Sequence, residues 1–224
     1  MSGGIERALV IGASGGIGGA VAAALEERGA LVTRLSRSED GLDVTDEASV
    51  EAALDALEPG FDLVFVATGA LAPVGEPEKS VGAVTGEALR AAFDVNAVGP
   101  MLCLKHALRL LPKDRRGVFA ALSARVGSIG DNRVGGWHSY RASKAALNQL
   151  LHGAAIELRR THREAVCLAL HPGTVETPFT AKYAGRHRTV SAAEAARNLL
   201  DVIERATPEM SGGFHDYAGR EIPW

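Results

Sequence analysis

The sequence is poor in cysteine, and the two cysteines it has are not arranged to bind a metal. Cys103 and Cys167 are the only two among 224 residues, and neither stands in a CxxC or CxxH motif. Each lies inside an apolar run, which favours a buried free thiol over a disulfide or a catalytic nucleophile. We therefore expect no metal site and assign the two thiols no chemistry.

Long apolar runs and an excess of charge of one sign are also missing. No run reaches the roughly 20 residues that a helix needs to cross a membrane. The N-terminal segment MSGGIER lacks the charged start and long apolar core of a signal peptide. The net charge is -3, without a basic stripe, which argues against nucleic acid as the main partner. We expect a cytoplasmic protein that binds neither a membrane nor a nucleic acid.

The overall composition is that of an ordinary globular protein. Hydrophobic residues make up 46% and charged residues 23% of the chain, which is enough to fill one sizeable core. No internal repeat, low-complexity tract or linker interrupts the sequence. We expect a single domain over residues 1–224.

A glycine-rich turn stands between an apolar run at residues 8–11 and a helical pattern at residues 20–29. Gly12, Gly16 and Gly18 allow a sharp turn, close approach to a pyrophosphate, and tight packing of the helix on the strand. The free N–H groups at the helix start favour a phosphate. The spacing GxxxGxG is less specific than GxGxxG, but its place between strand and helix predicts a dinucleotide site.

The same residues also match GxSxG, the nucleophile elbow of serine hydrolases. In that alternative Ser14 would be the nucleophile, and His171 or His215 would complete a triad. Against it, the elbow would stand on the first strand, too early for other strands and an oxyanion loop to precede it.

The second expected strand, at residues 31–35, ends in Ser36 and Arg37 rather than in a carboxylate. An acidic residue at this point accepts hydrogen bonds from the ribose of NAD, whereas a hydroxyl and a guanidinium suit the extra phosphate of NADP. The sequence thus favours NADP, with NAD as the alternative. Asp43 either accepts from the adenine amino group or caps the turn that follows.

Strand-type runs alternate with helical patterns along the rest of the chain. Further strands are expected at residues 42–44, 62–66, 117–122, 165–170 and 212–217. This order predicts an α/β Rossmann fold, a doubly wound parallel sheet of seven strands with helices on both faces. Ala67, Thr68 and Gly69 follow the strand at 62–66 and are small enough for a cofactor to lie against the backbone.

Two further patterns concern the middle of the chain. Residues 86–111 read as one long helix that Asn96 and Pro100 interrupt, because both fit poorly in a helix interior. Tyr140 and Lys144 are one helical turn apart, so the ammonium group can lower the pKa of the phenol toward neutrality. Ser123 follows the strand at 117–122, at the edge where such sheets bind ligands.

With these motifs in this order, the chain resembles the short-chain dehydrogenase/reductase family, and most of all its C-factor-like and sniffer-type carbonyl reductase members. The resemblance implies a Rossmann-fold oxidoreductase that acts on a small carbonyl or alcohol substrate. By this resemblance Tyr140 exchanges a proton with the substrate, and Lys144 assists Tyr140 and binds the nicotinamide ribose. Ser123 is then expected to hold the substrate oxygen, and Asn96 to anchor a water. The implied cofactor-binding residues are Gly12, Ser14, Gly16, Ile17, Gly18, Ser36, Arg37, Asp43, Ala67, Thr68, Gly69, Tyr140, Lys144, Pro172, Gly173, Val175 and Thr177.

The chain departs from the family pattern in two places. The family's NNAG-like motif is replaced by Val66–Gly69, so a brace must come from elsewhere, for example from Thr68. The interval from Ser123 to Tyr140 is long, and Trp137 or His138 is expected to wall the substrate pocket. The resemblance also implies a homodimer or homotetramer, and it leaves open a non-catalytic signalling protein that keeps the cofactor site.

Overall fold

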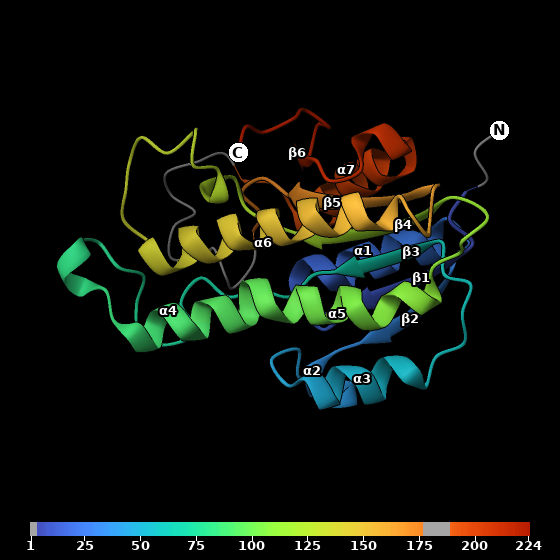
Figure 1. Ribbon diagram of the computed structural model, residues 1–224, viewed down its shortest axis with the longest axis horizontal. Helices are drawn as coiled ribbons and strands as arrows, with labels where there is room; N and C mark the ends of the chain where they lie inside the picture. The colour runs from blue at the N-terminus through green and yellow to red at the C-terminus, as the bar shows by residue number, and fades with distance from the viewer. Residues whose placement is uncertain (1–3, 177–188) are drawn as a thin grey trace.

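The computed structural model describes residues 4–176 and 189–224, which fold around one parallel six-stranded sheet (Figure 1). The order across the sheet is β2-β1-β3-β4-β5-β6. The fold class predicted from the sequence, a doubly wound α/β Rossmann fold, is confirmed. The strands are β1 (Arg7–Ile11), β2 (Leu31–Leu35), β3 (Leu63–Val66), β4 (Gly117–Leu122), β5 (Ala165–His171) and β6 (Phe214–Asp216).

The seventh strand predicted at residues 42–44 is wrong: this described segment forms no strand, and β2 is the edge of the sheet. Leu42 and Val44 are buried at 3% and 8% exposure and belong to the core. Between them the Asp43 carboxylate accepts from the Thr45 N–H at 2.9 Å. The backbone therefore turns here instead of pairing with β2, although the side chains of Leu42 and Val44 are still buried in the core.

Helices cover both faces of the sheet. Alternate strand residues such as Val10 and Phe65 pack against α1 (Gly16–Glu27) and α7 (Ala192–Arg205). Their neighbours Leu9 and Val64 pack on the other face. Because each central strand is buried on both faces, it reads as a continuous apolar run in the sequence. The other face is covered by α3 (Glu47–Asp55), α5 (Gly99–Ala107) and α6 (His138–Leu158); α2 (Arg37–Asp40) and α4 (Gly86–Phe93) complete the α-helices described.

The long helix predicted at residues 86–111 is present as α4, a π-helical turn at Asp94–Val98, α5 and a short 3-10 turn at Leu108–Leu110. Asn96 lies within the π-turn and is fully buried. Pro100 stands at the second residue of α5, directly after the π-turn. The helix defect therefore coincides with the polar residue that the sequence placed in it.

Both cysteines are buried free thiols, as the sequence predicted. Burial raises the pKa of each thiol to about 12, so neither is a thiolate near neutral pH. In the part of the chain that the structure describes, every helix is too short or too polar to span a bilayer.

Candidate active site

A cavity of about 810 Å³ opens at the carboxyl ends of the parallel strands, where ligands bind in open α/β sheets. Its wall combines the turn after β1, the segment after β3, the end of β4, the start of α6 and the segment after β5. The residues predicted for the site that line it are Ser14, Gly16, Ile17, Ala67, Thr68, Gly69, Ser123, Tyr140, Lys144, Pro172, Gly173 and Val175. Thr177 lies outside the described residues.

The glycine turn brings the end of β1 and the start of α1 into close contact. Gly12 has a φ of +88°, and a Cβ on Gly18 would lie 2.2 Å from the Gly12 carbonyl oxygen. The N-cap of α1, Gly15, offers no side chain to the first N–H groups of the helix. The first turn also contains no acidic residue. These N–H groups can therefore bind an anion, because the helix dipole supports the same charge.

Asn96 braces the segment that follows β3. Its Oδ1 accepts from the Ala70 N–H at 2.9 Å, and its Nδ2 donates to the Ala70 carbonyl at 2.8 Å and to Ser143 Oγ at 3.1 Å. The expectation that Thr68 supplies the brace is wrong, because Thr68 Oγ1 is buried without a hydrogen-bond partner in the described structure. Asn96 thus joins the π-turn, the segment after β3 and helix α6 at Ser143.

One face of α6 presents Tyr140 and Lys144 to the cavity, as their spacing predicted. The Lys144 Nζ donates to the Leu122 carbonyl at 2.8 Å, which ties the helix to the end of β4. The next residue, Ser123, donates from Oγ to Asn148 Oδ1 at 2.6 Å. No motif in the sequence pointed to Asn148, although its position four residues after Lys144 places it on the same face of α6.

Burial controls the proton affinities of this pair. Desolvation raises the pKa of Tyr140 above its ordinary value and lowers the pKa of Lys144 to about 7. The expectation that the ammonium group lowers the tyrosine pKa is therefore wrong for the protein without ligands. Both charged forms lose their hydration in the closed site, and this cost exceeds the attraction that the spacing suggested.

The low pKa of Lys144 predicts a pH-dependent stability. The unfolded chain, with a lysine pKa near 10.5, binds more protons than the folded protein between about pH 7 and pH 10.5. The contribution of Lys144 to the free energy of unfolding therefore rises with pH across that window. Lys144→Met should raise the free energy of unfolding by about 1–4 kcal/mol at pH 6 and by less at about pH 9. Urea unfolding of the ligand-free protein measures this.

The exposed Lys113 provides the control for this experiment. Lys113→Met removes the same charge from the surface and should change stability little at either pH. A stability gain in Lys144→Met that stays constant with pH would contradict the interpretation, because titration of the buried amine could not produce it.

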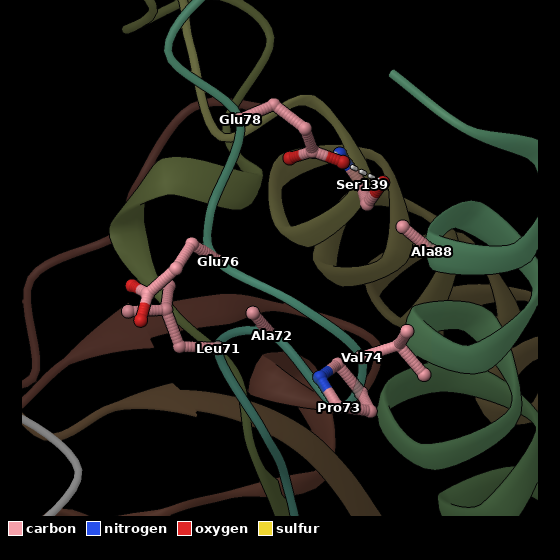
Figure 2. Close-up of a pocket in the computed structure, with 8 residues that line it drawn as sticks. All are labelled: Leu71, Ala72, Pro73, Val74, Glu76, Glu78, Ala88 and Ser139. Atoms are coloured by element: carbon pink, nitrogen blue, oxygen red, sulfur yellow. Dashed lines mark hydrogen bonds between the residues drawn. The ribbon is translucent and has the colours of Figure 1, made fainter. Parts of the chain in front are cut away.

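The N-terminus of α6 is held by Glu78, from a segment 61 residues away. Figure 2 shows the Glu78 carboxylate against Ser139, whose hydroxyl and N–H both donate to it. The Glu78 carbonyl also accepts from the Trp137 N–H at 2.6 Å. These bonds cap the helix and hold Trp137 in a left-handed conformation with a φ of +50°. No sequence signal connects residues so far apart, so Glu78 was not predicted.

Trp137 lines the cavity, as the sequence analysis expected for this interval, whereas His138 is not among the lining residues described. The Trp137 ring meets the Tyr140 ring edge to face, with centroids 6.4 Å apart. Three guanidinium groups, of Arg125, Arg133 and Arg141, line the same region. The Asp131 carboxylate, which pairs with Arg125 at 2.7 Å, also lines the cavity, so its wall carries aromatic, cationic and acidic groups.

The residues predicted for the adenosine end lie beyond the cavity lining. Ser36 is buried, and its Oγ accepts from the Glu39 N–H at 3.2 Å, so it caps α2. Asp43 caps its turn through Thr45, the second of the two roles considered for it. Arg37 is exposed at the first residue of α2. Ser36 and Asp43 hydrogen-bond to neighbouring backbone N–H groups. Of these three side chains, Arg37 is therefore the one available to bind a phosphate.

The serine hydrolase alternative gains no support from the described residues. Both ring nitrogens of His215, and Nδ1 of His171, are buried without a hydrogen-bond partner there. Burial, with the nearby Arg125, lowers the pKa of His171 to about 4. Neither imidazole is therefore arranged as a general base for Ser14.

A family profile described as short chain dehydrogenase matches residues 6–187. The chain belongs to the short-chain dehydrogenase family. This short-chain dehydrogenase is 32% identical over 235 residues to 1-hydroxy-2-glutathionyl-2-methyl-3-butene dehydrogenase of Rhodococcus sp. (strain AD45), covering 98% of this chain and 100% of the relative. It is 36% identical over 148 residues to C-signal of Myxococcus xanthus, covering 65% and 84% of the two chains.

A solved structure agrees with the same family. A short-chain dehydrogenase/reductase from Burkholderia multivorans, with bound NADP, superposes on this short-chain dehydrogenase with a TM-score of 0.83 at 28% identity. The match covers 98% of this chain and 100% of the other. The family that the sequence resembled is thereby confirmed, and C-signal is among its relatives.

Proposed function

We propose that this short-chain dehydrogenase is an NADP(H)-dependent oxidoreductase of carbonyl and secondary alcohol substrates. The observation that carries the proposal is the convergence of the glycine turn with Ser123, Tyr140 and Lys144 on one cavity. The Burkholderia multivorans relative with bound NADP supports the choice of cofactor. The name of the Rhodococcus relative, a dehydrogenase of a hydroxylated compound, supports the class of substrate.

NADP(H) supplies or accepts the hydride when it is bound. The uncapped N–H groups at Gly16 and Ile17 bind its pyrophosphate, and Gly69 leaves room beside Lys144, since a Cβ there would lie 3.3 Å from the Nζ. Tyr140, as a protonated phenol, donates its proton to the oxygen of a carbonyl under reduction. Ser123 orients that oxygen, and Lys144 binds the ribose and stabilises the phenolate that remains.

The raised pKa of Tyr140 suits the reduction direction, because it keeps the proton on the phenol until a substrate oxygen takes it. The lowered pKa of Lys144 places its protonation near neutral pH. The charge on Lys144 can thus respond to the charge on Tyr140. After reduction the ammonium group can return a proton to the phenolate, and in alcohol oxidation the amine can take the proton from the phenol. A turnover rate that changes around pH 7 follows from this arrangement.

The test of the proposal is NADPH oxidation with a panel of aldehydes and ketones, followed by absorbance. Turnover of any member supports the oxidoreductase. NADPH binding without turnover across the panel would instead support a regulatory protein. The similarity to a relative named C-signal is the reason to consider that alternative.

We expect Arg37 to determine the preference for NADP over NAD. Arg37→Gln should weaken NADPH binding about tenfold to a hundredfold, the value of a charge-assisted bond to the ribose phosphate. NADH binding should change little, because NADH lacks that phosphate. Fluorescence titration of both cofactors measures the effect, with the exposed Arg163→Gln as the control. Equal loss for the two cofactors would contradict the assignment.

We also propose that the protein forms a homodimer or homotetramer through α4, α5 and α6. Val98, between α4 and α5, and Ile156, on α6, expose 41% and 50% of their surface, and such apolar groups favour a protein partner when they share a face. Light scattering on the purified chain tests this, and a monomer at all concentrations would contradict it.

A further inference from the structure

The hydroxyl of Ser123 has a buried partner behind the cavity wall. Ser123 is 4% exposed and lines the cavity, whereas Asn148 is 2% exposed and is not among the lining residues described. The bond from Ser123 Oγ to Asn148 Oδ1 measures 2.6 Å. The serine oxygen thus lies between the cavity and a side-chain amide that substrate does not reach.

The same helix carries both Asn148 and Tyr140. The two residues are eight apart, about 12 Å along an α-helix, with Lys144 midway between them on the same face. Lys144 donates to the Leu122 carbonyl at 2.8 Å, and Ser123, the residue directly after β4, donates to Asn148. Helix α6 therefore places the phenol and also sets the direction of the serine hydroxyl.

Packing does not explain why an amide stands at this position. Asn148 Nδ2 is buried and lacks a hydrogen-bond partner in the described structure. A leucine has the same number and branching of side-chain heavy atoms and would leave no unpaired polar atom at position 148, which is normally the more stable arrangement. Among the described residues Ser123 is the one hydrogen-bond partner of the amide, so the role of Asn148 is best sought in that hydroxyl.

We propose that Asn148 is a positioning residue for Ser123 in the reaction proposed above, on which this inference rests. By accepting the hydrogen bond from the serine hydroxyl, the amide selects one hydroxyl orientation and directs the free lone pairs of Oγ toward the cavity. Those lone pairs accept from an alcohol substrate or from the Tyr140 hydroxyl. If the amide group rotates by half a turn, Nδ2 lies next to Ser123 and donates to Oγ. The serine hydroxyl can then donate its hydrogen bond to a carbonyl oxygen. Such preorganisation raises kcat rather than substrate affinity.

A double-mutant cycle tests the proposal with NADPH and whichever panel substrate the protein reduces fastest. Asn148→Leu in the Ser123 protein should lower kcat about tenfold to a hundredfold and leave KM nearly unchanged, since Asn148 does not line the cavity. In the Ser123→Ala background the same substitution should change kcat by no more than about twofold. Asn148→Asp, which keeps an accepting oxygen, should recover part of the loss.

Equal losses in the two backgrounds would overturn the proposal, because a merely structural role acts without Ser123. An unchanged kcat in Asn148→Leu would overturn it as well. Gln149→Leu, at the exposed neighbouring position of α6, is the matched control and should leave kcat as it is. If Asn148→Leu does not fold, the cycle is run with Asn148→Ala and Asn148→Asp under the same criteria.

The proposed function can fail separately from this inference. If the wild-type protein binds NADPH but reduces no substrate, the oxidoreductase assignment fails, and with it the reason for positioning Ser123. If Ser123→Ala loses activity while Asn148→Leu retains it, the oxidoreductase stands and only the role of Asn148 is refuted.

Discussion

Tyr140→Phe is expected to lower kcat for carbonyl reduction by about a thousandfold, within the range for loss of a general acid. The substitution removes the one proton donor that the proposed mechanism places at the substrate oxygen. Phenylalanine fills the same volume in a site where Tyr140 is only 7% exposed, so the fold should persist. Single-turnover oxidation of bound NADPH, followed by fluorescence, measures the step without interference from product release.

Two further measurements show whether the loss of kcat lies in the chemical step rather than in cofactor binding or folding. The NADPH dissociation constant and the midpoint of urea unfolding should stay close to those of the wild type, because the phenol is not required for the glycine turn. A variant that keeps most of its turnover would show that another group supplies the proton. The oxidoreductase mechanism proposed here would then be incorrect, even if the cofactor binds.

Gly18→Ala is expected to have the second large effect, on both folding and cofactor binding. Its Cβ would lie 2.2 Å from the Gly12 carbonyl oxygen and 2.9 Å from the carbonyl carbon, and backbone atoms cannot move aside as a side chain would. The turn and α1 must separate, at about 1–3 kcal/mol of stability. NADPH binding should weaken about a hundredfold, since the displaced N–H groups no longer reach both phosphates.

Gly153→Ala provides the matched control, because a Cβ at Gly153 in α6 meets no described atom within 4 Å. In a helix interior this change should stabilise the protein by about 0.5–1 kcal/mol. Thermal unfolding and NADPH titration of both variants give the comparison. If Gly18→Ala binds NADPH as tightly as Gly153→Ala does, the glycine turn is not the pyrophosphate site.

Local patterns in the sequence were sufficient for most of the architecture. Apolar runs such as the one at residues 62–66 are long enough to be buried on both faces, and helical periodicity separates them, so the parallel sheet follows. The strand predicted at residues 42–44 shows the limit of this reasoning. Leu42 and Val44 do enter the core, but a local turn at Asp43 takes up the backbone hydrogen bonds that a strand would need.

Spacing along one helix also predicted that Tyr140 and Lys144 share a face, since residues four apart always do so. It did not predict their proton affinities. A pKa depends on how much water each group loses, and that loss is decided by the surrounding elements. Here burial raises the pKa of Tyr140 and lowers that of Lys144, the opposite of what two isolated neighbours would give for the tyrosine.

By itself, the sequence determined the family, the order of strands and helices, the glycine turn, and the place of Ser123 at a strand end. These follow from periodicity, turn chemistry and short spacings, which act between residues close in the chain. Only the tertiary structure decided that Asn96 braces Ala70, that Glu78 caps α6 and that Asn148 accepts a hydrogen bond from Ser123. Those contacts join residues 25 to 61 positions apart, and a buried polar group takes whichever partner the packed elements bring within hydrogen-bond reach.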